Sequence, residues 1–252
     1  MKKFLFLGCF FLLLGCASNK KNDYSKMTDG EIYDSALSHL QNEHHLLAVG
    51  DFSQLEYNYP YSVHLASSWL LSGYAYYKEN KYTEAIEQFE KLIKFQPNNK
   101  NVPYAMYMIS MSYYDQISPI TRDQKMTELA LLNMEKLVNK FPDSKYANDV
   151  KPKILIARNN LAAKEMYIAK NLMKKKNIMA ALNRFQTIIA KYDTTLFVEE
   201  ALYRTIEIYL ILNELEDAEN MYRLLELNYP NSQWLSNAKE IIENHKKETL
   251  NF

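Results

Sequence analysis

The chain has 252 residues, and its 30 lysine and arginine side chains balance 30 aspartate and glutamate side chains, which gives a formal net charge of zero. A neutral chain offers no global basic surface, so no nucleic-acid partner is expected. The sequence contains only 5 glycines and 7 prolines and few runs of β-branched residues. This composition favours helices over a β-sheet.

The N-terminus, MKKFLFLGCFFLLLGC, is typical of a secretory signal. Lys2 and Lys3 precede an apolar run of about eleven residues, which is too short to span a bilayer. The segment ends in Leu-Leu-Gly-Cys at 13–16, which resembles the bacterial lipobox. The resemblance implies that the signal peptide, 1–15, is removed and that Cys16 carries the lipid. An ordinary signal peptide followed by an unrelated cysteine is the alternative.

The segment after the signal is predicted to be a flexible, polar tether over residues 16–27. Cys9 leaves with the signal, so Cys16 is the one remaining cysteine and no intramolecular disulfide can form. The residue after Cys16 is Ala17 and not an aspartate, which resembles the outer-membrane sorting signal of lipoproteins. We therefore expect a lipid-anchored protein on the periplasmic face of the cell outer membrane. Removal of the signal leaves 28 basic against 30 acidic side chains, a net charge of −2.

The stretch at 69–97, WLLSGYAYYKENKYTEAIEQFEKLIKFQP, predicts a helical hairpin. Its apolar residues have helical spacing on both sides of the polar KENKY segment. Gly73 lies within the first helix, where glycine costs about 1 kcal/mol relative to alanine, so we expect it to permit close packing. Ser72 stands where a leucine is usual, but the other marker residues match the tetratricopeptide (TPR) signature. They are Trp69, Gly73, Tyr76, Ala85, Phe89 and Pro97.

The second-helix half of this signature recurs five times along the chain. Because one TPR hairpin cannot cover its own apolar face, neighbouring hairpins must stack. The sequence therefore predicts an all-α TPR solenoid, over 28–252, of five helix-turn-helix repeats plus a C-terminal capping helix. The expected repeats are 28–61, 62–98, 101–143, 144–194 and 195–231, followed by the capping helix at 232–248. The recurring sets are Ala48, Phe52, Leu55, Pro60; Ala85, Phe89, Leu92, Pro97; Ala130, Met134, Leu137, Pro142; Ala181, Phe185, Ile188, Asp193; and Ala218, Tyr222, Leu225, Pro230.

Two repeats are longer than the usual TPR period of about 34 residues. In the third, SPITRDQK at 118–125 is predicted to lengthen the turn. Pro119 is expected to stop the first helix, and Thr121 or Asp123 to cap the second. In the fourth, the run from 147 to 176 contains no glycine, so its first helix is expected to be about twice the usual length.

Residue patterns for catalysis are sparse. The histidines do not form the helical zinc-protease pair, and the sequence contains neither G-x-S-x-G nor a phosphate-binding glycine loop. We therefore expect no enzyme activity, no metal site and no cofactor. A periplasmic wall hydrolase remains an alternative that turnover on peptidoglycan would reveal. The histidines are His39, His44, His45, His64 and His245.

The inner helices of TPR proteins line a concave groove. If Ala36, Gly73 and Ser110 occupy the glycine position of the signature, an aromatic stripe faces this groove. Tyrosine combines a wide apolar face with a hydrogen-bonding tip and suits peptide binding. The alternative is that these side chains pack between repeats. The candidates for client binding are Tyr33, Tyr74, Tyr77, Tyr107, Met111 and Tyr114.

The whole chain, over roughly 28–245, resembles the BamD family of lipoproteins from the outer-membrane β-barrel assembly complex. The resemblance is carried by the lipobox, the five repeats, the lengthened third turn and the long fourth-repeat helix. The most specific stretches are VPYAMYMISMSYY (102–114), RDQKMTELALLNMEKLVNKFPDSKY (122–146) and AALNRFQTIIAKYD (180–193).

This resemblance implies a non-enzymatic adaptor. Its C-terminal repeats would bind a POTRA domain of BamA, and its N-terminal repeats would receive unfolded outer-membrane proteins. The other Bam lipoproteins are further implied partners. Asn183-Arg184 matches a BamA-contacting arginine of the family, and arginine can bind a carboxylate through two parallel hydrogen bonds. A solvated helix-face charge is the alternative for Arg184.

This sequence departs from the family in the insert at 118–125, which is shorter than in better-known members. Any partner bound by that loop therefore cannot be carried over, nor can contacts made by residues 16–28. A different TPR lipoprotein, such as a pilus-secretin pilotin or a cell-envelope coordination protein, is the alternative adaptor. Depletion of the protein distinguishes these functions. Loss of many barrel proteins from the outer membrane would support the BamD function, whereas loss of pili alone would support a pilotin.

Overall fold

The computed structural model describes residues 23–250, which form one short 3-10 helix and a series of α-helices. The predicted signal peptide, Cys16 and the tether up to residue 22 lie outside the described residues. The 3-10 helix η1 spans Tyr24–Lys26. The α-helices are α1 Asp29–Gln41, α2 His45–Asn58, α3 Leu65–Lys78, α4 Tyr82–Phe95, α5 Val102–Tyr114, α6 Lys125–Lys140, α7 Lys145–Lys174, α8 Ile178–Lys191, α9 Val198–Ile211, α10 Leu215–Asn228 and α11 Gln233–Leu250.

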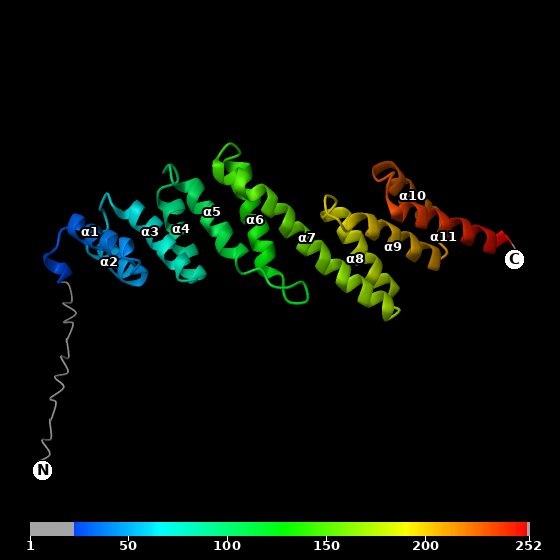
Figure 1. Ribbon diagram of the computed structural model, residues 1–252, viewed down its shortest axis with the longest axis horizontal. Coiled ribbons are helices and arrows are strands. Elements are labelled where there is room, and N and C mark those ends of the chain that lie inside the picture. Colours follow the sequence, from blue (N-terminus) through cyan, green and yellow to red (C-terminus); the bar gives the residue numbers. More distant parts are fainter. Residues whose placement is uncertain (1–22, 251–252) are drawn as a thin grey trace, which may run out of the picture.

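Consecutive helices pair as antiparallel hairpins that stack along the long axis of the molecule, from α1 and α2 at one end to α11 at the other (Figure 1). Contacts between second neighbours join α3 to α5, α5 to α7 and α9 to α11. The odd-numbered helices therefore form one layer, and the even-numbered helices α2 to α10 form the other. This is the all-α solenoid of TPR hairpins with a C-terminal capping helix that the sequence predicts.

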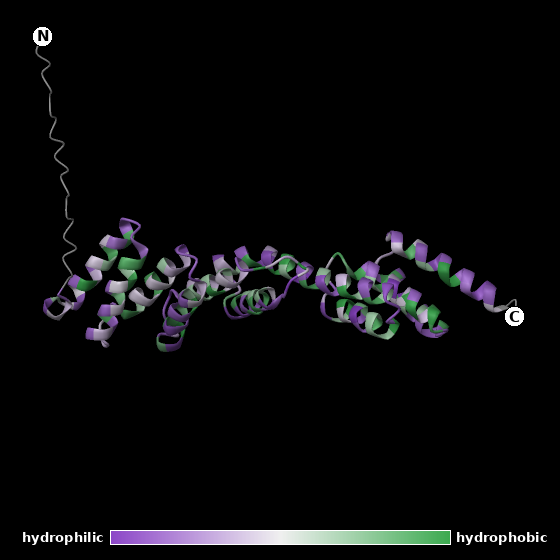
Figure 2. Ribbon diagram, turned by 90° about the horizontal axis from the view of Figure 1, so that it is seen from below, coloured by the Kyte–Doolittle hydropathy of each residue, from purple (hydrophilic) through white to green (hydrophobic). Residues whose placement is uncertain are grey.

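A buried ridge on each even-numbered helix forms the centre of its repeat. Figure 2 shows that apolar and polar residues alternate around the helices. The alanine, aromatic and aliphatic positions of the recurring pattern are almost all fully buried, as the TPR interpretation requires. Tyr222 of α10 is the exception, since it is half-buried and donates a 3.3 Å hydrogen bond to Glu226. The first four sets are Ala48, Phe52, Leu55; Ala85, Phe89, Leu92; Ala130, Met134, Leu137; and Ala181, Phe185, Ile188.

Gly73 of α3 lies directly against the ring of Phe89 in α4. A Cβ atom at position 73 would lie 2.6 Å from Cε1 and 2.7 Å from Cζ of that ring. Phe89 itself is fully buried, so its ring has little room to move. The two helices of this hairpin can therefore approach closely only because residue 73 has no side chain.

Four of the five repeats share one turn between their helices. The residues Glu43, Asn80, Lys176 and Asn213 each adopt a left-handed backbone conformation, with φ between 56° and 61°. The next residue donates its N–H back across the turn, as in the 2.9 Å bond from Lys81 N to Tyr76 O. This is the Schellman motif, which satisfies carbonyls at a helix C-terminus.

The turn of the third repeat differs from the others and from the prediction. Helix α5 ends at Tyr114, five residues before Pro119, so the proline does not stop it. Thr121 does not cap α6, whereas the carboxylate of Asp123 accepts a 2.9 Å hydrogen bond from Lys125 N. Gln124 is the N-cap residue, and its buried side-chain amide donates to the Pro119 carbonyl at 3.1 Å.

The predicted long helix of the fourth repeat is confirmed, because α7 has 30 residues. Its N-terminal half packs against α6, where Val150 and Ala157 join Met134 in one apolar cluster. Its C-terminal half packs against α8, where Met166 joins Phe185. One continuous helix therefore connects the third repeat to the fourth.

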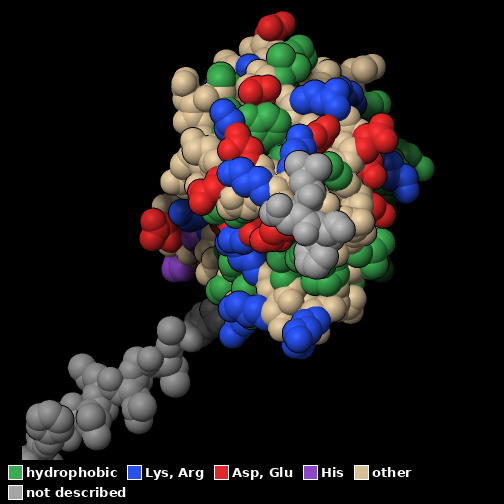
Figure 3. All heavy atoms as spheres, turned by 90° about the vertical axis from the view of Figure 1, so that its right-hand side faces the viewer, with side chains coloured by type: hydrophobic (Ala, Val, Ile, Leu, Met, Phe, Trp, Pro, Cys, Tyr) green, Lys and Arg blue, Asp and Glu red, His purple; other side chains and the backbone are tan. Residues whose placement is uncertain are grey.

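Helix α11 covers the last repeat. Its Ala238 and Ile242 pack on α9 and α10 beside Leu225. Seen from this end, lysine, arginine, aspartate and glutamate side chains are interspersed over the surface (Figure 3). Such a polar outer face is expected of a terminal cap. None of the helices within 23–250 combines the length and apolar character that a membrane span requires.

The close approach at Gly73 yields a stability prediction. Gly73→Ala should lower the free energy of unfolding by about 1 to 3 kcal/mol, because the overpacked methyl group outweighs the better helix propensity of alanine. Gly50→Ala is the matched control, since nothing lies within 4 Å of a Cβ at this helical site. It should stabilise the protein by about 0.5 to 1 kcal/mol. Urea unfolding measures both, and equal effects would contradict this account.

Candidate functional surfaces

Three of the predicted groove tyrosines lie on α1 and α3, and each has a different environment. Tyr74 is 36% exposed. Tyr33 stacks on His64, with ring centroids 4.5 Å apart. Tyr77 is partly buried, and its hydroxyl donates a hydrogen bond to Asp115 at the end of α5. Burial, followed by this hydrogen bond, raises the pKa of Tyr77. Of these three side chains, Tyr74 offers the most surface to a ligand.

A second tyrosine group spans α5 and α7. The Tyr146 ring centroid lies 5.3 Å from that of Tyr107 and 5.4 Å from that of Tyr104. Burial raises the pKa of Tyr104 to about 12, and burial with a hydrogen bond to Asp149 raises that of Tyr107 to about 12. These hydroxyls therefore stay protonated at neutral pH and remain hydrogen-bond donors. The Tyr107 hydroxyl already donates to Asp149, so this group offers a ligand mainly its apolar ring faces and the Tyr104 hydroxyl.

The structure corrects the prediction for Met111. Its side chain is only 5% exposed and belongs to the core cluster that includes Val150 and Ala157 of α7. The long α7 covers this position, whereas the equivalent Tyr74 of the second repeat is open. Met111 therefore offers almost no surface for binding. Tyr114, which is half-buried, packs against the same cluster.

Arg184 lies on α8 with 46% of its side chain exposed. Its Nη1 donates to both carboxylate oxygens of Glu165 on α7, at 3.0 and 3.3 Å. Nε and Nη2 of Arg184 donate no hydrogen bond to another described residue. Nη1 of the guanidinium is therefore held in place from within the chain, while the side chain stays 46% exposed. Such an arrangement can present two parallel donors to a carboxylate from another molecule.

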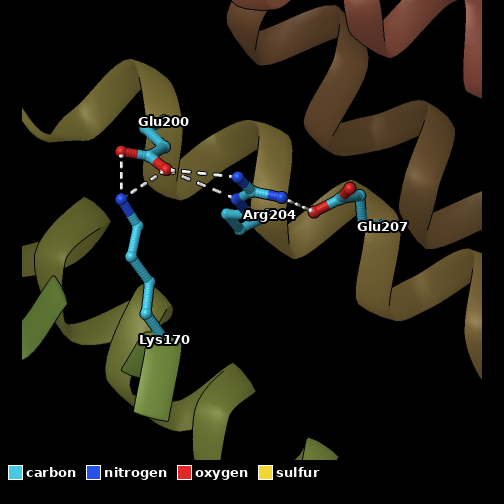
Figure 4. A network of polar contacts seen from close by, with 4 residues as sticks. All are labelled: Lys170, Glu200, Arg204 and Glu207. Atoms are coloured by element: carbon cyan, nitrogen blue, oxygen red, sulfur yellow. Dashed lines mark hydrogen bonds and ion pairs between the residues drawn. The ribbon is translucent and has the colours of Figure 1, made fainter. Parts of the chain in front are cut away.

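A charged network that was not predicted from the sequence joins α7 to α9 (Figure 4). Glu200 lies between two cations, with Lys170 Nζ 2.7 Å and Arg204 Nε 3.4 Å from its Oε1. Arg204 also contacts Glu207 at 2.7 Å, and its guanidinium lies 5.7 Å from the Trp234 ring centroid. Both carboxylates are engaged by cations, so this network connects the last repeats and α11.

The carboxylate of Asp51 on α2 is also unpredicted from the sequence, and it is buried, with 2% of the residue exposed. It accepts hydrogen bonds from Tyr24 and Ser35, both at 2.6 Å. The Tyr24 contact, together with a 2.5 Å bond from Tyr59 Oη to Met27 O, holds η1 against the first repeat. The predicted flexible tether of 16–27 is therefore too long, because residues 24–27 are bound to the solenoid.

No group of three or more His, Cys, Asp or Glu side chains able to hold a metal ion occurs between residues 23 and 250. His45 instead connects the first two repeats, with Nδ1 2.7 Å from Glu79 Oε1. His44 is the N-cap residue of α2 but makes no side-chain capping bond.

Two solved structures described as TPR proteins align with this chain at low sequence identity. The P58(IPK) TPR domain aligns with a TM-score of 0.44 and 15% identity, covering 88% of this chain and 66% of that domain. A thermophilic TPR protein from Thermus thermophilus aligns with a TM-score of 0.37 and 13% identity, covering 86% of this chain and 98% of that one.

Sequence comparison is more specific. Residues 25–225 match the family model described as YfiO, outer membrane lipoprotein. The outer membrane protein assembly factor BamD of Rickettsia prowazekii is 34% identical, with 93% of this chain and 94% of that protein covered. BamD of Caulobacter vibrioides is 32% identical, with 92% and 77% covered. BamD of Neisseria meningitidis is 31% identical, with 82% of each covered. The chain therefore belongs to the BamD family of outer-membrane protein assembly factors.

Proposed function

We propose that this protein is a non-enzymatic adaptor, lipid-anchored through Cys16 to the periplasmic face of the outer membrane. It binds BamA through the surface around Arg184, acts alongside the other Bam lipoproteins and receives unfolded outer-membrane proteins on its N-terminal tyrosine surface. The family membership supports the assembly role. The proposed separation of BamA binding from client binding rests on the position of the two surfaces on different repeats.

The half-exposed arginine supports the BamA contact. Glu165 binds Nη1 of Arg184 but leaves the other guanidinium donors available. A POTRA carboxylate can therefore bind Arg184 without displacing Glu165. Because the internal contact already restricts the side chain, less conformational entropy is lost on binding.

The tyrosine surface supports client binding. An unfolded barrel protein presents apolar and aromatic side chains together with unpaired backbone groups. Tyr74 offers an open ring, while Tyr104 and Tyr107 offer partly buried rings with protonated hydroxyls. Rings of this kind contact varied side chains without requiring one sequence, as a receptor for many clients must.

The anchor can be tested first. Cys16→Ser should leave a soluble or uncleaved periplasmic protein, because serine lacks the thiol that would carry the lipid. Stable anchoring needs several acyl chains, since one chain binds a membrane only marginally. Fractionation of membranes from the periplasm measures this. Wild-type membrane retention of the mutant would contradict the assignment of Cys16.

Arg184→Glu should weaken the BamA complex by about 2 to 5 kcal/mol, since it leaves a partner carboxylate unpaired and opposed by a like charge. Co-purification with BamA from detergent-solubilised membranes measures the loss. Arg122→Glu is the control, because it reverses an exposed arginine outside the C-terminal repeats. The assignment is wrong if Arg184→Glu leaves the complex intact or if both variants weaken it equally.

Replacing Tyr74 and Tyr77 with alanine should reduce affinity for the C-terminal peptide of a barrel protein, because two rings that contact its aromatic residues are removed. Fluorescence titration measures the affinity. Tyr77→Phe isolates the loss of the hydrogen bond to Asp115, which connects the second and third repeats.

Tyr57→Ala serves as the control for the tyrosine variants, since this ring is 82% exposed but lies on the outer helix α2. It should leave peptide affinity unchanged. BamA co-purification should survive all these changes, because each repeat contacts only its neighbours. Loss of BamA binding in a folded tyrosine variant would contradict the proposed division of labour.

A further inference from the structure

One edge of the first two repeats exposes apolar side chains that the surfaces described above do not use. The turn between α2 and α3 presents Tyr61, which is 97% exposed, and Val63, which is 87% exposed. Phe95, at the end of α4, is 58% exposed. These three residues line one hollow of about 490 Å³, whose wall includes Trp69. We call the surface formed by Tyr61, Val63 and Phe95 the aromatic edge.

Cations accompany these apolar side chains. Lys94 Nζ lies 5.3 Å from the ring centroid of Phe95, and Lys100 is exposed in the turn that follows α4. Asp29 accepts a 2.7 Å hydrogen bond from Ser62, and Glu56 pairs with Lys91 at 2.8 Å. Glu90, one helical turn before Lys94, is an exposed carboxylate near that lysine. The aromatic edge therefore combines exposed rings with two exposed lysines.

The chain enters the solenoid at this edge. Tyr59, next to the exposed residues, donates a 2.5 Å hydrogen bond to the carbonyl of Met27. Ser62 donates to Asp29 at the first turn of α1. The start of α1 is therefore bound to the turn that carries the aromatic edge.

The remaining tether is short. Tyr24 is bound to Asp51, so only residues 16–23 separate the proposed lipid from the solenoid. Eight residues span at most about 29 Å when fully extended. If Cys16 carries the lipid, as in the proposed function, the first repeat must stay within this distance of the bilayer surface. Because the anchor would keep this surface close to the bilayer, its effective concentration at the membrane would be high.

We propose that the aromatic edge rests on the phospholipid surface that holds the lipid anchor. Aromatic side chains favour the headgroup level of a bilayer, where the ring contacts the acyl boundary and the polar tip stays hydrated. Lysines at this level are attracted to anionic headgroups. This contact orients the solenoid, with its N-terminal repeats against the membrane. The inference deepens the proposed function and depends on its lipid anchor for the tether length.

Vesicle partitioning tests the contact apart from the lipid. The mature chain carrying Cys16→Ser is mixed with vesicles of phosphatidylethanolamine and phosphatidylglycerol, and the bound fraction is measured by sedimentation. We expect measurable partitioning that falls at least fivefold in the double variant Tyr61→Ser with Val63→Ser. Both residues are almost fully exposed, so the fold should survive, and circular dichroism checks this.

The matched control is Leu196→Ser with Leu227→Ser, which removes side chains that are 86% and 80% exposed in the C-terminal half. It should partition like the parent chain. Lys94→Glu with Lys100→Glu should reduce binding by at least about fivefold per lysine. This loss should vanish on vesicles of phosphatidylcholine alone, because their surface carries no net charge.

Three results would overturn the proposal: no partitioning of the parent chain, equal partitioning of the aromatic-edge variant, or an equal loss in the leucine control. A fourth is loss of affinity for an apolar peptide with unchanged vesicle binding, which would make the edge a peptide site. Failure here leaves the proposed function testable by itself, because membrane retention through Cys16 and co-purification through Arg184 are measured separately.

Discussion

The structure depends on one packing constraint, which is that no hairpin can cover its own apolar ridge. Ala85, Phe89 and Leu92 of α4 are fully buried only because α3 lies on one side and α5 on the other. The same arrangement holds from repeat to repeat until α11 covers the last one. Stability is therefore built from neighbouring contacts, and the chain extends in one direction. Gly73 shows how tight these contacts are, since a single methyl group would overlap the Phe89 ring.

This architecture leaves the faces of the helices available for binding. The identities of the residues that pack repeats together are constrained by their burial in the ridge. Positions turned away from the ridge can vary with function. Tyr74 and Arg184 lie on such positions, and Tyr61 lies in a turn between helices, so the three residues belong to three different surfaces. A solenoid can therefore hold several macromolecular partners at once, which is what an adaptor in an assembly complex requires.

The sequence predicts the ridge, the fold and the long α7, because these follow from helical periodicity and from the absence of helix-breaking residues. It could not predict contacts between helices far apart in sequence. Met111 follows the same pattern as Tyr74, but it is buried in a cluster with Val150 and Ala157 of α7. The pairing of Arg184 with Glu165 depends on the relative rotation of α7 and α8, which periodicity leaves open. The buried Asp51 gave no signal, since its donors come from η1 and α1.

Helix α7 also relates the two proposed binding surfaces. Tyr146, near its start, contacts Tyr107 in the tyrosine group, while Glu165 holds Arg184 on the other surface. These two positions are nineteen residues apart on one continuous helix, which corresponds to about 28 Å. A client on the N-terminal repeats and a partner at Arg184 would therefore be held at a nearly fixed separation. The length of α7 would therefore set the spacing between the two proposed binding surfaces.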